Sequence, residues 1–141
     1  AASKNQDKFI RICGDSPFID PAIIDQAVYL STTSDFDLVT NVFPRSFPKG
    51  QSVEVIRTKT IQQICCKNRS AEEKEHATSY IYNNHPQFRI CAFSSGENAA
   101  NSRQCIDDEK DYSIAKNIIA LHDTNDLGWR EIKNLWNDER N

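Results

Sequence analysis

One stretch decides the expected fold of this 141-residue chain: Arg11-Ile12-Cys13-Gly14-Asp15-Ser16-Pro17-Phe18-Ile19-Asp20-Pro21. It closes an apolar run over residues 9–13 that is too short for a helix and rich in β-branched side chains, which predicts a buried strand. Gly14 ends the strand, and Asp15 follows at its carboxyl end, where open α/β sheets place their ligands. The chain then turns into a helix, with Asp20 as the expected N-cap and Pro21 as the first helical residue.

A Gly-Asp pair after a strand has two interpretations. Both residues favour turns, so the pair can serve the turn alone. In the second interpretation, Asp15 is a ligand-binding carboxylate, and Gly14 lets the backbone come close to something bulky.

Composition and charge narrow the class of protein. The chain is 38% hydrophobic and 26% charged, which is ordinary for one soluble globular domain. A net charge of -3 argues against a general affinity for nucleic acid. No apolar run is long enough for a bilayer, and no secretory signal is visible. Five widely spread cysteines, an odd number, suit a reducing cytoplasm, and most of them are expected to be small buried side chains. We therefore expect a cytoplasmic protein, with neither nucleic acid nor membrane as a partner.

Strand and helix patterns alternate along the chain. A helix from residue 21 to about 30 and a strand over 35–41 complete a βαβ unit, which is typical of α/β proteins. Residues 42–51 contain two prolines and a glycine and are expected to form a loop. The pattern then predicts strands over 52–56 and 87–93 and a short one after residue 102. It predicts helices over 58–67, from Ser70 until His85-Pro86 closes the helix, over 111–122 and around Trp129 and Trp136.

The first strand also raises a question about the start of the chain. Residues 9–13 have the pattern of an interior strand, which needs neighbours on both sides. Residues 1–7 are polar and carry no helix start signal. We therefore expect that a segment upstream of this chain is missing.

Two further patterns have ordinary structural interpretations. His76 lies on a partly apolar expected helix, where a histidine is more often packed or exposed than catalytic. The acids between residues 107 and 111 suit the positive end of the helix that follows them, so they can serve as caps alone.

Several motifs resemble one family, in the order in which that family has them. Residues 14–21 resemble the Gly-Asp-Cys-Pro-Leu-Ile-Asp-Pro segment of cytidylyltransferases of the spore coat polysaccharide biosynthesis protein F type, relatives of 3-deoxy-manno-octulosonate cytidylyltransferase. Residues 47–55 resemble Phe-Pro-Asp-Gly-Leu-Asp-Val-Glu-Val, residues 75–78 resemble Glu-His-Val-Thr, and residues 102–111 resemble Leu-Arg-Trp-Thr-Val-Asp-Thr-Pro-Glu-Asp. This sequence departs from the family at Lys49, Ser52, Ser79 and Gln104.

The resemblance implies a partial Rossmann-like nucleotide-diphospho-sugar transferase fold, an α/β fold with a mixed sheet flanked by helices. It also implies a Mg²⁺-dependent cytidylyltransferase that transfers CMP from CTP to a hydroxyl of an acidic or amino sugar, for surface polysaccharide or glycan biosynthesis, and that forms a homodimer. Two aspartates are a sufficient protein contribution to a Mg²⁺ site, because this ion keeps waters and takes phosphate oxygens.

The resemblance also assigns roles by position. Asp15 and Asp107 would be catalytic and hold the metal, and Arg103 would be catalytic by neutralising a carboxylate or phosphate. Each of the two aspartates follows a predicted strand, so in a shared sheet they would meet at one edge of one crevice. The substrate-binding residues would be Gly14, Pro17, Lys49, Gly50, Glu54, Glu75 and His76.

One part of the family pattern has no counterpart between residues 1 and 141. Relatives bind CTP with an amino-terminal strand and a Gly-rich loop that carries Arg and Lys and ends in Leu-Pro-Gly-Lys. We therefore expect a single domain over 1–141 that is the carboxyl-terminal portion of a nucleotidyltransferase domain, inactive alone. The alternative is a non-catalytic sugar-nucleotide or partner-binding module of the same fold, and a glycosyltransferase of related fold is a weaker third.

Overall fold

A four-stranded mixed sheet lies at the centre of the computed structural model, which describes residues 7–67 and 69–140. Its strands are β1 (Lys8–Arg11), β2 (Leu38–Thr40), β3 (Glu54–Arg57) and β4 (Ile90–Ala92), in the order β1-β3-β2-β4. β3 is antiparallel to β1 and β2, whereas β2 and β4 are parallel. The predicted α/β class with a mixed sheet is therefore confirmed.

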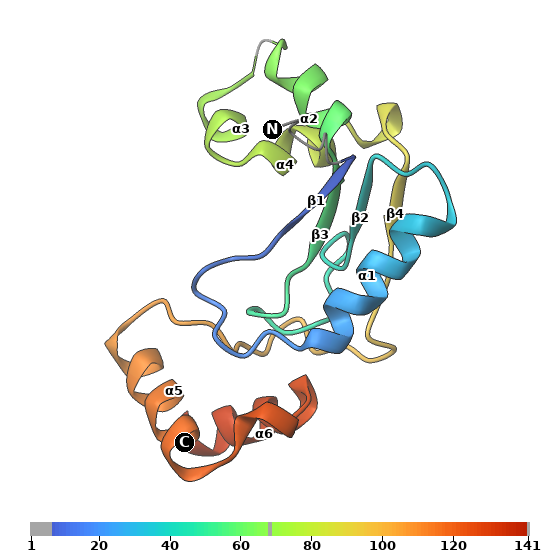
Figure 1. Cartoon of the computed structure of the whole chain (residues 1–141). Helices are drawn as coiled ribbons and strands as arrows, with labels where there is room; N and C mark the ends of the chain where they lie inside the picture. Colours follow the sequence, from blue (N-terminus) through green and yellow to red (C-terminus); the bar gives the residue numbers. More distant parts are fainter. Residues whose placement is uncertain (1–6, 68, 141) are drawn as a thin grey trace, which may run out of the picture.

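Helices lie on the sheet and at its two ends (Figure 1). α1 (Pro21–Thr33) runs along one face of the sheet. A group at one end comprises α2 (Thr58–Cys65), α3 (Ala71–Glu75), α4 (Ala77–Asn83) and the 3₁₀ turn η1 (His85–Gln87). A pair at the other end comprises α5 (Glu109–Leu121) and α6 (Trp129–Arg140), joined through the 3₁₀ turn η2 (Thr124–Asp126).

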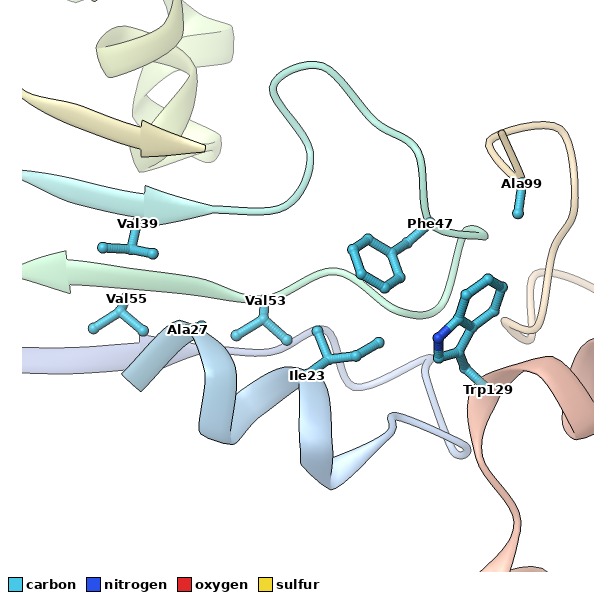
Figure 2. Packing of buried hydrophobic residues seen from close by; sticks show 8 residues of the cluster. All are labelled: Ile23, Ala27, Val39, Phe47, Val53, Val55, Ala99 and Trp129. Carbon is cyan, nitrogen blue, oxygen red and sulfur yellow. The ribbon is translucent and has the colours of Figure 1, made fainter. Parts of the chain in front are cut away.

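Alternation along β3 buries side chains on both faces of the sheet. Val53 and Val55 point to α1 and join Ile23, Ala27, Val39, Phe47, Ala99 and Trp129 in one cluster, shown in Figure 2. Ile56 points to the opposite face and packs with Leu38, Ile64 of α2 and Ile81 of α4. A third cluster joins α5 and α6 around Trp136. The sheet is thus covered on both faces, as α/β architecture requires.

The start of α1 follows the prediction and does more than expected. Asp20 accepts a hydrogen bond from the backbone N of Ala22 (2.8 Å), and Pro21 is the first helical residue. The second oxygen of the same carboxylate accepts the backbone N of Trp129 (3.0 Å), the first residue of α6. One side chain therefore caps two helices that are far apart in the sequence.

Buried amides join the sheet to α6. Asn41 binds the backbone on both sides of Ser52: it donates to the carbonyl of Gln51 (2.6 Å) and accepts from the N of Val53 (2.9 Å). The side chain of Gln51 donates to Gln104 Oε1 (2.6 Å), and Gln104 donates to the carbonyl oxygen of Trp129 (2.6 Å). All three amide side chains belong to fully buried residues, so each hydrogen bond satisfies polar groups that water cannot reach.

The first strand differs from its prediction. β1 is an edge strand, whose one neighbour among the described residues is β3. Phe9, Ile10 and Ile12 are therefore 38%, 42% and 40% exposed, where a buried interior strand was predicted. The apolar pattern correctly predicts a strand here, but it does not show how many neighbouring strands that strand has.

Three smaller predictions are corrected as well. The helix predicted from Ser70 to the closing pair His85-Pro86 begins with the expected capping box but breaks at His76, whose backbone is extended. The strand predicted after residue 102 is reduced to an isolated bridge between Lys49 and Arg103. Cysteines are less buried than expected: Cys105 is buried, whereas Cys65 and its neighbour Cys66 are exposed.

None of the helices that the structure describes combines the length and the apolar character needed to cross a bilayer.

Candidate functional site

Asp15 and Asp107 line the same small cavity, of about 200 Å³. Three segments form its walls: residues 13–16 after β1, residues 45–52 in the loop before β3, and residues 105–107 before α5. The lining residues besides the two aspartates are Cys13, Ser16, Arg45, Lys49, Gly50, Ser52 and Cys105.

Backbone hydrogen bonds hold these three segments together. The N of Lys49 donates to the carbonyl of Ser102 (2.9 Å), and the N of Gln104 donates to the carbonyl of Lys49 (2.7 Å). The N of Ile106 donates to the carbonyl of Asp15 (2.9 Å). These bonds bring Asp107 beside Asp15, although no strand forms before Asp107.

Gly50 makes the closest approach between two of these segments. Its φ is +96°, a conformation that favours glycine, and a Cβ there would lie 2.6 Å from the carbonyl oxygen of Gln104. No atom lies within 4 Å of the corresponding position on Gly14, which is exposed. The structure therefore requires glycine at position 50 for packing within the chain, and at position 14 the space is open.

Asp15 is exposed and accepts a hydrogen bond from the hydroxyl of Ser16 at Oδ1 (3.0 Å). Asp107 accepts two bonds at Oδ2, from Arg103 Nη2 (2.6 Å) and from the Cys105 thiol (3.6 Å). Burial, with the Asp107 carboxylate adding to it, raises the pKa of the Cys105 thiol, so the thiol stays protonated and donates.

Arg103 is shared between two carboxylates. It contacts Asp107, which is 54% exposed, and Asp111 of α5, whose side chain is fully buried. Asp111 also accepts Arg140 Nη1 (3.3 Å) and the backbone N of Asp107 (3.1 Å). Sequence reasoning assigned the acids of this stretch to capping or, at Asp107, to metal binding, and it missed the buried role of Asp111.

The donor atoms around the cavity suit a hard cation. Within residues 7–67 and 69–140, no cluster of three or more His, Cys, Asp or Glu side chains could form a metal centre. The protein donors here are two carboxylates with a serine hydroxyl beside them, and Mg²⁺ prefers such oxygens, completing its shell with waters and phosphate. The residues present therefore fit Mg²⁺.

Two basic residues lie at the same cavity. Lys49 is exposed, and Arg45 donates to the carbonyl of Pro48 (3.4 Å) within the loop. Positive groups beside carboxylates and a cation can neutralise phosphate oxygens. Sequence reasoning did not name Arg45 as a site residue, although the basic loop before residue 52 was the signal that could have found it.

The structure locates the remaining predicted residues away from this cavity. Glu54 is buried on β3, between Arg11 (2.6 Å) and the hydroxyl of Tyr82 (2.5 Å). Burial, with the Glu54 charge, raises the pKa of Tyr82. Pro17 lines a separate cavity, near η2.

The predicted sugar-binding pair lies between α3 and α4. His76 is exposed at the junction of the two helices. Glu75 ends α3, and its side chain lies outside the part of the chain that the structure describes.

The fold, with its mixed sheet and flanking helices, is of the nucleotide-diphospho-sugar transferase type. A solved cytidylyltransferase from Leptospira borgpetersenii matches 96% of this chain and 58% of its own, with a TM-score of 0.85 and 24% sequence identity. The predicted fold is thus confirmed.

Relatives by sequence support the resemblance found in the motifs. The chain is 29% identical over 113 residues to the spore coat polysaccharide biosynthesis protein SpsF of Bacillus subtilis, a match that covers 76% of this chain and 45% of that protein. It is 26% identical over 128 residues to an uncharacterized protein of Methanocaldococcus jannaschii, covering 89% of this chain and 51% of that one. No family model matches. The suspected resemblance is confirmed, and the chain spans about half the length of these relatives.

Proposed function

We propose that this chain is part of a cytidylyltransferase, which transfers CMP from CTP to a hydroxyl of an acidic or amino sugar and depends on Mg²⁺. The observation that carries the proposal is the shared cavity of Asp15 and Asp107, with Arg45 and Lys49 beside them. Carboxylates for a cation and basic groups for phosphates are what nucleotidyl transfer needs.

Each residue has a role in this proposal. Asp15 and Asp107 would hold the ion, and the bound ion would supply charge stabilisation to the phosphate oxygens. Arg45 and Lys49 would bind phosphate oxygens directly, and Arg103 would keep the charge around Asp107 balanced. The backbone of Gly14, next to Asp15, is open to a ligand.

The size of the cavity limits what it can hold. Ligand pockets are typically roughly 300–1,000 Å³, and this cavity measures about 200 Å³. We therefore assign it to the metal and the phosphates. The base and ribose would need further walls, and the sugar would extend toward Glu75 and His76, as the family resemblance implies.

Two other proposals accompany this function. A homodimer rests on the family resemblance alone and is checked by light scattering of the purified protein. A cytoplasmic location is supported by the odd number of scattered cysteines and is checked by cell fractionation.

Pyrophosphate release from CTP tests the proposal, with Mg²⁺ and a panel of acidic and amino sugars. The 141-residue chain is compared with the chain extended upstream to its natural start codon. We expect turnover from the extended chain only. If neither chain turns over and both bind a CMP-sugar, the non-catalytic binding module replaces the proposal.

Asp15→Asn tests the metal site within that assay. The variant keeps the size of the side chain and loses its charge, so turnover should fall at least 100-fold while the far-UV circular dichroism is unchanged. Asp25→Asn, at an exposed position of α1, is the matched control and should retain full turnover. Turnover that survives Asp15→Asn would remove Asp15 from the mechanism.

A further inference from the structure

Asp111 is an unusual residue for its position. It lies in the first turn of α5, and its side chain is fully buried. Aspartate is almost never fully buried unless it is paired. Neither the predicted capping role nor the roles proposed above explain why a charge is held there.

The contacts of Asp111 divide between its two oxygens. Oδ1 faces Arg140 of α6 (3.3 Å). Oδ2 receives both the Arg103 guanidinium and the backbone N of Asp107 (3.1 Å). One oxygen therefore pairs with α6, and the other binds Arg103 and the backbone of Asp107, which lines the cavity.

We propose that Asp111 is a positioning residue for the metal site, which it serves by drawing the charge of Arg103 away from Asp107. This inference rests on the proposed function, because it assumes that Asp107 holds a cation. Asp111 itself does not contact the cavity.

Charge balance explains why such a residue is needed. The same nitrogen of Arg103, Nη2, contacts both Asp107 and Asp111. Without the Asp111 charge, Arg103 would pair with Asp107 alone and compete with a cation for its Oδ2. With the Asp111 charge present, Arg103 also pairs with this buried carboxylate, where water screens the attraction only weakly.

Asp111 also fixes the segment that carries Asp107. That segment has no strand ladder, and the side chain of Asp107 is about half exposed. The bond from the Asp107 backbone N to Asp111 Oδ2 anchors it directly. Outer groups that orient a ligand commonly change metal affinity by 10–100-fold when they are removed.

Mn²⁺ binding tests the inference without any substrate. Mn²⁺ replaces Mg²⁺ in the chain extended to its natural start codon, and free Mn²⁺ is measured by electron paramagnetic resonance. Asp111→Asn removes the charge but keeps an oxygen that can accept the Asp107 N–H. We expect its Mn²⁺ affinity to fall 10–100-fold.

Arg140→Met is the matched control. It removes the other partner of the same buried carboxylate and leaves Arg103 in place. Both variants should lower the melting temperature, and only Asp111→Asn should lower the Mn²⁺ affinity more than threefold. Equal Mn²⁺ affinities in the two folded variants would overturn the inference.

The double variant Arg103→Gln/Asp111→Asn separates the charge effect from folding. It removes both charges of the pair and so leaves no unpaired buried charge between them. Mn²⁺ affinity should return to within threefold of the wild-type value, whereas turnover should not, because Arg103 is absent. An affinity still 10-fold or more below wild type would overturn the inference, even if Asp111→Asn alone does not fold.

Failure of the proposed function has a different signature. A wild-type protein that binds Mn²⁺ but releases no pyrophosphate contradicts the cytidylyltransferase, and the Mn²⁺ comparison still decides the role of Asp111. A wild-type protein that binds no Mn²⁺ overturns both the metal site and the role of Asp111.

Discussion

Gly50 shows how much of the candidate site depends on a single residue. Its positive φ and its approach to the carbonyl of Gln104 allow the loop to lie against residues 102–106. Both features exclude a Cβ, and the close neighbour is backbone, which cannot turn aside as a side chain can.

Gly50→Ala should therefore lower the free energy of unfolding by about 3 kcal/mol, from backbone strain and the clash together. Urea denaturation measures the loss. Gly14→Ala is the control, because the space around Gly14 is open, and it should change stability by less than about 0.5 kcal/mol. Similar losses in both variants would contradict this account of Gly50.

Single residues also mark the limit of sequence reasoning. Asp15 and Asp107 were predicted to meet because each was expected to follow a strand of one sheet. They do meet, but Asp107 reaches the cavity through loop contacts that no local pattern encodes. Glu54 matched a motif equally well, yet its place in β3 buries its side chain, which pairs with the partly exposed Arg11.

At the scale of elements, Asp20 joins helix α1 to helix α6, because its side chain caps the amino-terminal ends of both. Asp20→Ala removes the acceptor for both Ala22 N and Trp129 N, and the stability should fall by about 2 kcal/mol in chemical denaturation. Asp108→Ala removes the side-chain cap of α5 alone and should cost less. If Asp20→Ala loses no more stability than Asp108→Ala, one of the two hydrogen bonds that Asp20 accepts contributes nothing to the stability.

The cap of α5 also predicts a dependence on pH. The backbone N of Asp111 donates to the Asp108 carboxylate, which lowers the pKa of Asp108 below its ordinary value. A group with a lowered folded-state pKa stabilises the fold above its unfolded-state pKa, and this contribution is lost as the pH falls through the folded-state value. Asp108→Asn should therefore flatten the loss of stability below about pH 4. Melting temperatures between pH 6 and pH 3 provide the check.

The sequence predicted the type of an element, helix or strand, better than it predicted which other elements that element contacts. The Asp20–Pro21 start of α1 and the Ser70 capping box were predicted because each signal lies within one turn of helix. The break at His76 was missed, since both flanking segments are helical and the apolar spacing continues across it. The edge position of β1 was missed because strand order depends on contacts far apart in the sequence.

At the scale of the whole molecule, hydrogen bonds between buried side chains join the sheet to α6, beside the apolar contacts of Trp129. Gln104 connects the amides of the sheet side to the first residue of α6, and both tryptophans of the chain belong to α6. Unfolding followed by tryptophan fluorescence and by circular dichroism should therefore coincide in the wild type.

Gln104→Ala should separate the two transitions. It leaves Gln51 Nε2 and the Trp129 carbonyl with one buried bond fewer each, a loss of about 3 kcal/mol concentrated at α6. The fluorescence midpoint in urea should fall below the midpoint seen by circular dichroism. Coincident midpoints in the variant would mean that other contacts hold α6 to the sheet.

The exposed edge of β1 has a consequence for the recovery of this chain from denaturant. Edge strands commonly avoid self-association with free charges, but here Lys8 donates to the carbonyl of Ser31, and Arg11 pairs with Glu54. Phe9, Ile10 and Ile12 remain accessible, and β3 is the one strand among the described residues that pairs with β1. The yield of refolding by dilution should therefore drop as the protein concentration rises. Ile10→Lys should restore the yield, because it places a solvated charge where the edge strands of two chains would otherwise pair.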